Sequence, residues 1–228
     1  NDCELAAAVI DTLGVLAEEH GYRVFWMTEC AWRDSLTQLT AIAIATTRIC
    51  LGTGILPMFS RSPLVTAMSS AGLASVSNGR FILGLGVGNR PAVEDGHGLR
   101  FEKPMEHLRD LTRIVRGLLQ GEKISYQGKA IAVSDVSLGD SAPKDRLPIY
   151  IAALGPRMLE LAGEVAVGFL LSLTASHYLH AALKIFPLRS FPLRTHLSSV
   201  SFPRFLLFSL PLFLSPLLPR LPDTLSPS

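Results

Sequence analysis

The chain has 228 residues, of which 48% are hydrophobic and 18% charged, and its formal net charge is +2. This composition excludes wholesale disorder and a strongly basic nucleic-acid-binding protein, while the length suits one globular domain with a substantial core. Three cysteines without a Cys/His cluster argue against a disulfide framework and a zinc site, so we predict no metal and a cytoplasmic location.

The predicted elements alternate between helix and strand. Apolar residues recur at helical spacing in some segments, whereas short and nearly continuous apolar runs indicate buried strands in others. Gly21, Asp34 or Ser35, and the Asn78-Gly79 pair supply the expected caps and turn. In chain order we predict a helix over 4–20, a strand over 23–28, a helix over 35–46, a strand over 48–56, a helix over 63–74, a strand over 80–88, a helix over 105–119, a hairpin over 123–134, a strand over 149–153, a helix over 156–164 and a strand over 165–173.

This alternation predicts the α/β fold class with a parallel sheet, because the strands are apolar on both faces and must be covered on both. A doubly wound sheet and a (β/α)₈ TIM barrel are the two architectures that fit. A complete barrel takes roughly 250 residues. The patterned part of this chain, with five strands, would supply only part of one.

The composition changes sharply near residue 175. All 18 glycines lie at or before Gly168, whereas eight of the 15 prolines lie between Pro187 and Pro227. Residues 1–164 carry 16 Lys/Arg and 18 Asp/Glu, a net charge of −2, and residues 165–228 carry five basic residues against Asp223, a net charge of +4. We therefore divide the chain into a domain over 1–175 and an anomalous tail over 176–228.

The tail is rich in Pro, Leu, Ser and Phe, and its prolines exclude an ordinary helix or central strand. We expect that it does not continue the upstream domain and is disordered or read out of frame; a genuine but unusual tail is the alternative. Residues 205–219 form an uncharged run of 15 residues with three prolines. This is short of the ~20 residues that a membrane span needs, so membrane association is a weaker hypothesis.

Three ordered blocks carry a resemblance to a known family. They are LGTGILP at 51–57 with RSP following at 61–63, SNGRFILGLGVG at 77–88, and PIYIAALGPRMLELAGE at 148–164. Together they resemble the luciferase-like monooxygenase superfamily, most closely its coenzyme F420-dependent, methylenetetrahydromethanopterin reductase-like branch. The resemblance covers roughly residues 4–173.

The resemblance implies a (β/α)₈ barrel that binds a flavin or deazaflavin at the carboxyl ends of its strands. On that map the five predicted strands correspond to the second through sixth barrel strands. The first would lie before Asn1, and the tail would replace the seventh and eighth. The implied activity is hydride transfer between the cofactor and a small organic substrate, and many relatives are dimers, which makes a homodimer an option here.

Glycines interrupt the predicted strand over 48–56, which often marks a bulge or a close approach of backbone to a ligand. The resemblance implies a bulge with a cis non-prolyl peptide that supports the cofactor ring from behind. Here that peptide would be Gly54–Ile55 or its neighbour. An ordinary bulge without a ligand is the alternative.

Gly84, Gly86 and Gly88 alternate along the strand over 80–88. They do not form a dinucleotide-binding GxGxxG motif, because Asn89 stands where the third glycine belongs. Small residues on one face of a barrel strand would leave space for a bound ring, so all three are candidate cofactor-binding residues. Tight strand packing without a ligand is the alternative.

Gly155, Pro156 and Arg157 follow a strand and begin a helix, where backbone N–H groups can face an anion. The resemblance implies that this turn holds the cofactor phosphate; a plain turn with a solvated arginine is the alternative. Luciferase has an arginine at the position of Val87 and polar phosphate ligands at the positions of Leu154 and Gly155. These differences favour coenzyme F420 over FMN.

Glu29 follows the strand over 23–28 at the end where barrel chemistry gathers, and it is the candidate catalytic residue. It could orient substrate or relay a proton, and a loop salt bridge is the alternative. Many relatives have Glu-His at this point, whereas this chain has Glu29-Cys30. The missing imidazole argues against peroxyflavin-type oxygen chemistry.

Three functions are therefore compatible with the sequence. The leading one is an F420- or FMN-dependent oxidoreductase or monooxygenase. The second is an inactive truncated or frameshifted fragment of such an enzyme. The third is a membrane-associated protein that uses the apolar tail.

Overall fold

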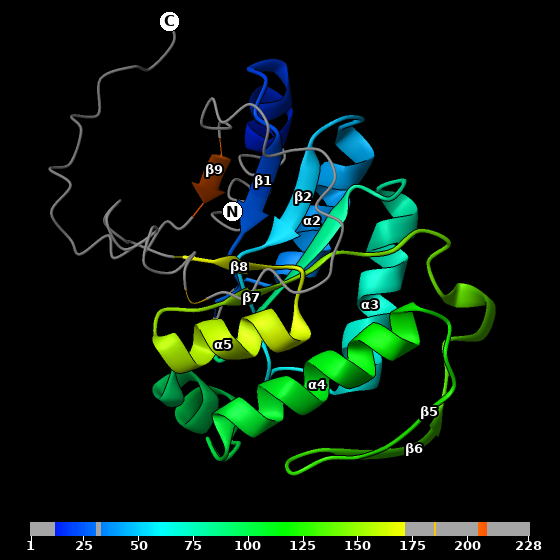
Figure 1. The fold of residues 1–228 in the computed structure, drawn as a ribbon. Coiled ribbons are helices and arrows are strands. Elements are labelled where there is room, and N and C mark those ends of the chain that lie inside the picture. The colour runs from blue at the N-terminus through cyan, green and yellow to red at the C-terminus, as the bar shows by residue number, and fades with distance from the viewer. Residues whose placement is uncertain (1–11, 31–32, 172–184, 186–204, 209–228) are drawn as a thin grey trace, which may run out of the picture.

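The computed structural model describes residues 12–30, 33–171, 185 and 205–208 (Figure 1). Parallel strands form one curled sheet in the order β8-β7-β4-β2-β1-β9, and β3 pairs with β4 beyond the end of β2. The strands are β1 (Val24–Met27), β2 (Cys50–Thr53), β3 (Leu56–Pro57), β4 (Phe81–Gly86), β7 (Ile149–Ala152), β8 (Gly168–Leu170) and β9 (Phe205–Phe208).

Helices cover the convex side of the sheet, and each lies beside the next one in the chain (Figure 1). Residues 12–19 are helical and precede β1. A small antiparallel hairpin, β5 (Ile124–Gln127) and β6 (Ala132–Val136), stands apart from the main sheet. The helices are α2 (Ser35–Ala45), α3 (Pro63–Val76), the π-helical turn η1 (Ala92–Gly96), α4 (Pro104–Leu119), the short 3₁₀ turn η2 (Gly139–Ser141) and α5 (Pro156–Val165).

The two faces of the sheet carry different side chains, because successive residues of a strand point to opposite sides. Phe25, Leu51 and Leu83 are fully buried in the core with the helices. On the opposite face the rings of Trp26 and Tyr150 meet edge to face at 6.0 Å. That inner face corresponds to the inside of a barrel.

The local signals at the element ends behave as expected. The Asp34 side chain accepts from the Thr37 N–H and caps α2, and Ser62 does the same for α3 through Val65. Gly21, Asn78 and Gly79 all have positive φ, as the caps and turns require. The α/β class, the parallel sheet and the order of its strands in the chain are confirmed.

Three predicted strands differ from the observed ones only at their ends, and two differ more. The strand predicted over 48–56 is two strands, because the chain bulges between Thr53 and Leu56. The strand predicted over 165–173 is shortened to β8, because α5 continues through Val165 before the chain turns. The last part of the predicted strand and the first part of the predicted helix over 4–20 lie outside the described residues.

Most of the predicted tail also lies outside the described residues. The exception in the sheet is β9, which pairs in parallel with β1 from Val24↔Phe205 to Met27↔Phe208. It occupies the edge of the sheet, the place where prolines on either side are tolerated. The division of the chain near residue 175 remains a prediction.

Candidate active site

The predicted site residues gather at the carboxyl ends of the strands, because parallel strands end on the same side of the sheet. Glu29 follows β1, Gly54 and Ile55 form the bulge after β2, and Gly86 ends β4. Gly155 lies three residues beyond the end of β7. This is the end at which barrel enzymes place their chemistry.

The bulge is tied to β1 on one side. The Gly54–Ile55 peptide is cis, as predicted. The Gly54 N–H donates to the Met27 carbonyl at 2.8 Å, and the Thr28 hydroxyl donates to the Gly54 carbonyl at 3.0 Å. The Glu29 N–H donates to the Ile55 carbonyl at 3.3 Å, so the candidate catalytic residue and the bulge are direct neighbours.

Gly86 lies against the bulge on the other side. A Cβ at Gly86 would come within 2.9 Å of the Ile55 side chain and 3.2 Å of the Ala152 Cβ. A Cβ at Gly84 would come within 2.0 Å of the Thr53 carbonyl oxygen. The open space expected beside these two glycines is therefore filled by protein, and their absent side chains let the bulge and the sheet approach closely.

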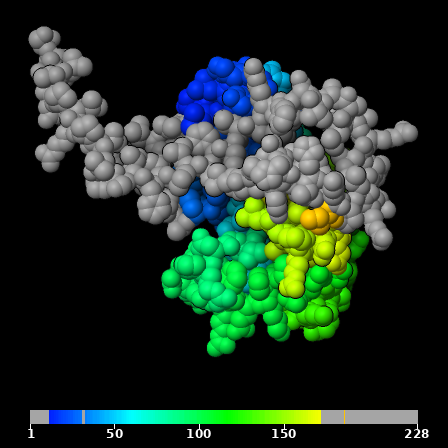
Figure 2. Space-filling model, turned by 60° about the vertical axis from the view of Figure 1, so that its left-hand side comes forward, coloured from blue at the N-terminus to red at the C-terminus, as the bar shows by residue number. Residues whose placement is uncertain are grey.

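Gly88 has a different environment. Its φ is +73°, and it is exposed in the turn that leaves β4. A Cβ at Gly88 would lie 3.4 Å from the Pro57 Cβ, which is an ordinary contact. Figure 2 shows that the segment following this turn projects from the same face of the molecule as α5. Of the three alternating glycines, Gly88 is the one open to a ligand.

The turn into α5 has the features of an anion site. Gly155 caps α5 without a side-chain hydrogen bond, and nothing lies within 4 Å of the position of a Cβ there. Pro156 and Arg157 are exposed in the first turn of the helix. The Met158 and Leu159 N–H groups donate to the Gly155 carbonyl at 3.0 Å, and Pro156 has no N–H, so in this first turn the Arg157 N–H and guanidinium are the groups that can face the phosphate of F420 or FMN.

Glu29 is held in a network of charges. Its carboxylate accepts from Arg61 at 2.6 Å and from the Ser35 hydroxyl at 3.0 Å, and its side chain is only 10% exposed. Arg61 also pairs with Asp34. Burial would raise the pKa of Asp34, but the Thr37 N–H and Arg61 outweigh it, so the net shift is downward. The salt bridge that we gave as the alternative role of Glu29 therefore exists, with Arg61 as its partner, and it holds the side chain of a residue that adjoins the bulge.

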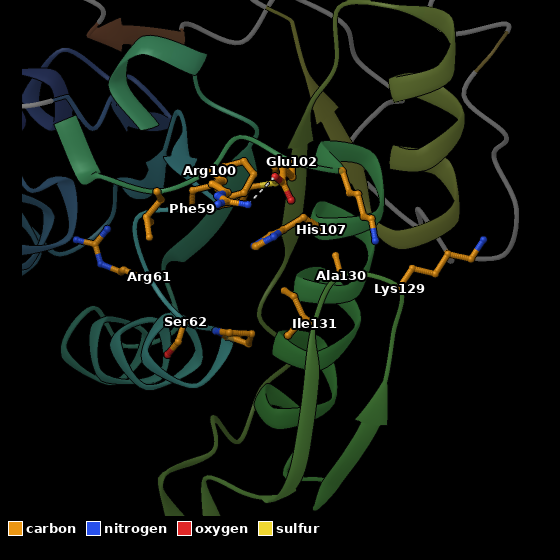
Figure 3. A pocket seen from close by; sticks show the side chains of 13 residues that line it. Phe59, Arg61, Ser62, Arg100, Glu102, His107, Lys129, Ala130 and Ile131 are labelled. Carbon is orange, nitrogen blue, oxygen red and sulfur yellow. Dashed lines mark ion pairs between the residues drawn. The ribbon is translucent and has the colours of Figure 1, made fainter. Parts of the chain in front are cut away.

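A cavity of about 500 Å³, which no sequence pattern predicted, lies next to this network (Figure 3). It lies between the segment after β3 and the start of α4, and Phe59, Arg61 and His107 line it. Burial lowers the pKa of His107, although the charge of Asp110 acts in the opposite direction. The RSP motif pointed to Arg61 as part of a block, but no local pattern links it to His107.

The described residues offer neither a metal-binding cluster nor a membrane-spanning helix. They include no group of three or more His, Cys, Asp or Glu side chains that could hold a metal ion. None of their helices is long and apolar enough to cross a membrane. The apolar run behind the membrane hypothesis lies, except for β9, outside these residues.

The fold is a curled parallel sheet of the kind found in half of a TIM barrel, and the candidate site residues lie at the carboxyl ends of its strands. Comparison with known proteins makes the assignment specific. The sequence model of the luciferase-like monooxygenase family matches residues 6–185. The protein belongs to the luciferase-like monooxygenase family.

Several relatives are similar in sequence or structure. A 5,10-methylenetetrahydromethanopterin reductase of Methanolobus tindarius is 39% identical over 163 residues, which cover 71% of this chain and 48% of that protein. An F420-dependent glucose-6-phosphate dehydrogenase of Mycobacterium avium is 34% identical, covering 69% and 51%. The solved F420-dependent tetrahydromethanopterin reductase of Methanopyrus kandleri has a TM-score of 0.68 and 28% identity, covering 80% of this chain and 57% of that one. The chain thus spans about half the length of its curated relatives.

Proposed function

We propose that the protein is an oxidoreductase that passes a hydride between coenzyme F420 and a small organic substrate. The observation that carries the proposal is the convergence of Glu29, Ile55, Gly86 and Ala152 at the carboxyl ends of adjacent strands. The F420-dependent relatives support the choice of cofactor. FMN is the alternative cofactor.

In this proposal each part of the site has one task. The cofactor, when bound, supplies the redox chemistry. Ile55, supported by Gly86 and Ala152, would form the flat wall behind the ring. Gly155, Pro156 and Arg157 would hold the phosphate, and Gly88 would give the ligand access beside the end of β4.

Glu29 would act on the substrate side. Its backbone N–H contacts the bulge, and its carboxylate is held by Arg61 and Ser35. A carboxylate fixed in this way can orient a substrate hydroxyl or amine, or relay a proton as the hydride moves. Arg61 is then a positioning residue that acts through Glu29.

Titration of the purified chain with F420 and with FMN tests the cofactor. We expect saturable quenching of F420 fluorescence, with binding at least ten times tighter than that of FMN. A cooperatively folded chain that binds neither cofactor would contradict the proposal and favour the inactive-fragment hypothesis. Preferential binding of FMN would overturn the choice of F420 alone.

Gly155→Asp tests the phosphate site. An aspartate fits the backbone there and caps α5, but it places a negative charge where the phosphate would lie. We expect stability to be kept or raised while F420 binding weakens by about tenfold or more. Gly155→Ser is the matched control, because it caps the helix without the charge. Equal loss of binding in both variants would argue against a phosphate at this turn.

A homodimer is a further part of the proposal. Neither α2 nor α3 contains a charged residue, and each exposes large apolar side chains, Ile44 at 75% and Met68 at 55%. An uncharged surface of this kind is well matched by the same surface of a second copy. Light scattering should give a dimer for the wild type and a monomer for the variant with Ile44→Glu and Met68→Glu. A wild-type monomer at micromolar concentration would contradict it.

We also propose a cytoplasmic location, because Cys30 and Cys50 are free thiols in the described part of the chain. Cell fractionation tests it. Recovery of the native protein in the membrane pellet after a carbonate wash would instead support the tail as an anchor.

A further inference from the structure

The cavity beside Arg61 is separate from the candidate cofactor site. It lies between the N-terminal ends of α3 and α4, and the turn of the β5–β6 hairpin closes one side through Lys129, Ala130 and Ile131 (Figure 3). The segment that follows β3 forms the wall between the two sites, since the Met58 N–H donates to the Gly86 carbonyl at 2.9 Å. A volume of about 500 Å³ lies within the range of small-molecule sites.

One part of the cavity lining is aromatic and apolar, formed by side chains that include Phe59, His107 and Ile131. The rings of Phe59 and His107 both line it and lie 4.5 Å apart at 44°. Phe101 lies 5.4 Å from Phe59 but does not line the cavity, and Arg90 lies over its ring. Figure 3 shows the His107 ring pointing into the space between Phe59 and Ile131. A flat ring of a ligand could stack there in the offset or tilted geometry that aromatic groups prefer.

The lining of the cavity is predominantly cationic. Arg61, Arg100, Lys103 and Lys129 contribute to it, against one carboxylate, Glu102. Arg61 turns away toward Glu29 and Asp34, and Arg100 lies 3.7 Å from Glu102. Lys103 and Lys129 are exposed near the opening, so the surplus of positive charge lies at the rim.

We propose that this cavity binds a small aromatic acid, with its ring against Phe59 and His107 and its anionic group toward Arg100 and the lysines of the rim. The aromatic floor and the cationic rim come from three segments that are far apart in the sequence, 58–63, 99–107 and 129–131. The site is independent of the proposed hydride transfer, and the aromatic acid should bind whether or not the cofactor is present.

The hairpin wall is held by a buried carboxylate. Asp110 accepts from the Tyr126 hydroxyl and from the N–H groups of Ala130 and Ile131 at 2.7–3.1 Å. A Cβ at Gly128 would come within 2.2 Å of the same carboxylate, so the glycine lets the hairpin turn approach α4. The cavity is therefore a built part of the fold and does not depend on a freely moving loop.

Calorimetric titration of the full chain without cofactor tests the proposal, with 1-naphthoate as the probe, 1-naphthamide as its neutral match and phenyl phosphate as a second anion. We expect 1-naphthoate to bind with a Kd below about 1 mM and 1-naphthamide to bind at least ten times more weakly. Tighter binding of phenyl phosphate would show that the anionic group is a phosphate. Absence of binding by both anions at 5 mM, or equal binding of acid and amide, would overturn the proposal.

Variants locate the site. Arg100→Gln combined with Lys129→Gln should weaken 1-naphthoate about tenfold, and Phe59→Leu should weaken the acid and the amide alike. Lys123→Gln is the matched control, because Lys123 belongs to the same hairpin but pairs with Asp135 outside the cavity. Equal effects of the control and the double variant would place binding elsewhere. Saturating F420 should leave 1-naphthoate binding unchanged, and direct competition would contradict two separate sites.

Discussion

The two ends of the strands are built in different ways. At the amino ends, charged side chains form hydrogen bonds with the backbone groups of the turns. Arg80, just before β4, donates to the carbonyls of Ala43, Thr46, Ile49 and Ser77 at 2.8–2.9 Å. At the carboxyl ends the backbone is partly left open, as at Gly155, and the charged groups pair with one another around Arg61.

Glu18 repeats the pattern of the amino ends. Its carboxylate accepts from the N–H groups of Thr47, Arg48 and Ile49 just before β2 begins. Charged side chains therefore bind several backbone groups at the amino ends of the strands, whereas the candidate site residues lie at the carboxyl ends. This difference predicts that the amino ends of the strands contribute most to stability. In the proposed function, ligand binding belongs to the carboxyl ends, where barrel enzymes place their active sites.

Arg80→Ala should have the largest effect. It leaves several carbonyls without their donor, and removing hydrogen bonds to a charged group lowers the free energy of unfolding by roughly 3 kcal/mol or more in total. Urea denaturation measures the loss. Arg80→Lys should recover only a part, because one ammonium cannot reach the same set of carbonyls. A loss below 1 kcal/mol would show that the amino ends do not hold the fold.

Asp110→Asn should rank second, at about 1–3 kcal/mol, because the buried carboxylate holds the hairpin against α4. Burial raises the pKa of Asp110, but hydrogen bonds from the Ala130 and Ile131 N–H groups and the Tyr126 hydroxyl lower it by more, so the net shift is downward. Its contribution is therefore present above the ordinary carboxyl pKa of about 4 and is lost as the pH falls through the lowered value. Wild type and variant Tm values should converge between neutral and strongly acidic pH. A constant difference would contradict this assignment.

Glu18→Gln should cost less, about 1 kcal/mol, because the network is partly exposed and an amide keeps one acceptor. Burial raises the pKa of Glu18, yet the N–H groups of Ile49, Arg48 and Thr47 lower it more. The stabilisation is thus present above the ordinary pKa and disappears with acidification. Thermal melts at neutral and acidic pH measure it, and Glu19→Gln on the neighbouring residue should change little.

Glu29→Gln should have the smallest effect on stability, about 1 kcal/mol or less, because glutamine still accepts from Arg61 and Ser35 and Arg61 keeps Asp34 as a partner. If Glu29 acts on the substrate as proposed, the rate of hydride transfer should fall by roughly 100-fold or more. Glu29→Gln should therefore lower kcat and leave the Tm almost unchanged, whereas Glu18→Gln should lower the Tm and leave kcat almost unchanged. An unchanged kcat with intact cofactor binding would leave Glu29 as a structural residue.

Much of the fold follows from the sequence because its signals are local. Apolar periodicity, the caps at Asp34 and Gly21 and the glycines of the bulge each act within a few residues, and the cis Gly54–Ile55 peptide followed from a block resemblance. The cavity could not be predicted in this way. Phe59 and His107 meet only after α3 and α4 pack side by side.

The alternating glycines show the same limit. Their spacing pointed to the inner face of a barrel strand, but whether a ligand or protein fills the space depends on neighbouring strands. Ile55 and Ala152 fill it at Gly86, and the Thr53 carbonyl fills it at Gly84. Only Gly88, beyond the end of the strand, matches the expectation of open space.

Amide hydrogen exchange with and without coenzyme F420 tests the central claim most directly. At saturating F420 we predict slower exchange at the non-proline residues of 54–58, 86–89 and 155–159, all at the carboxyl ends of the strands. Exchange at residues 46–50 and 77–80, at the amino ends, should stay the same. Protection confined to the amino ends, or no protection anywhere at saturation, would contradict the account.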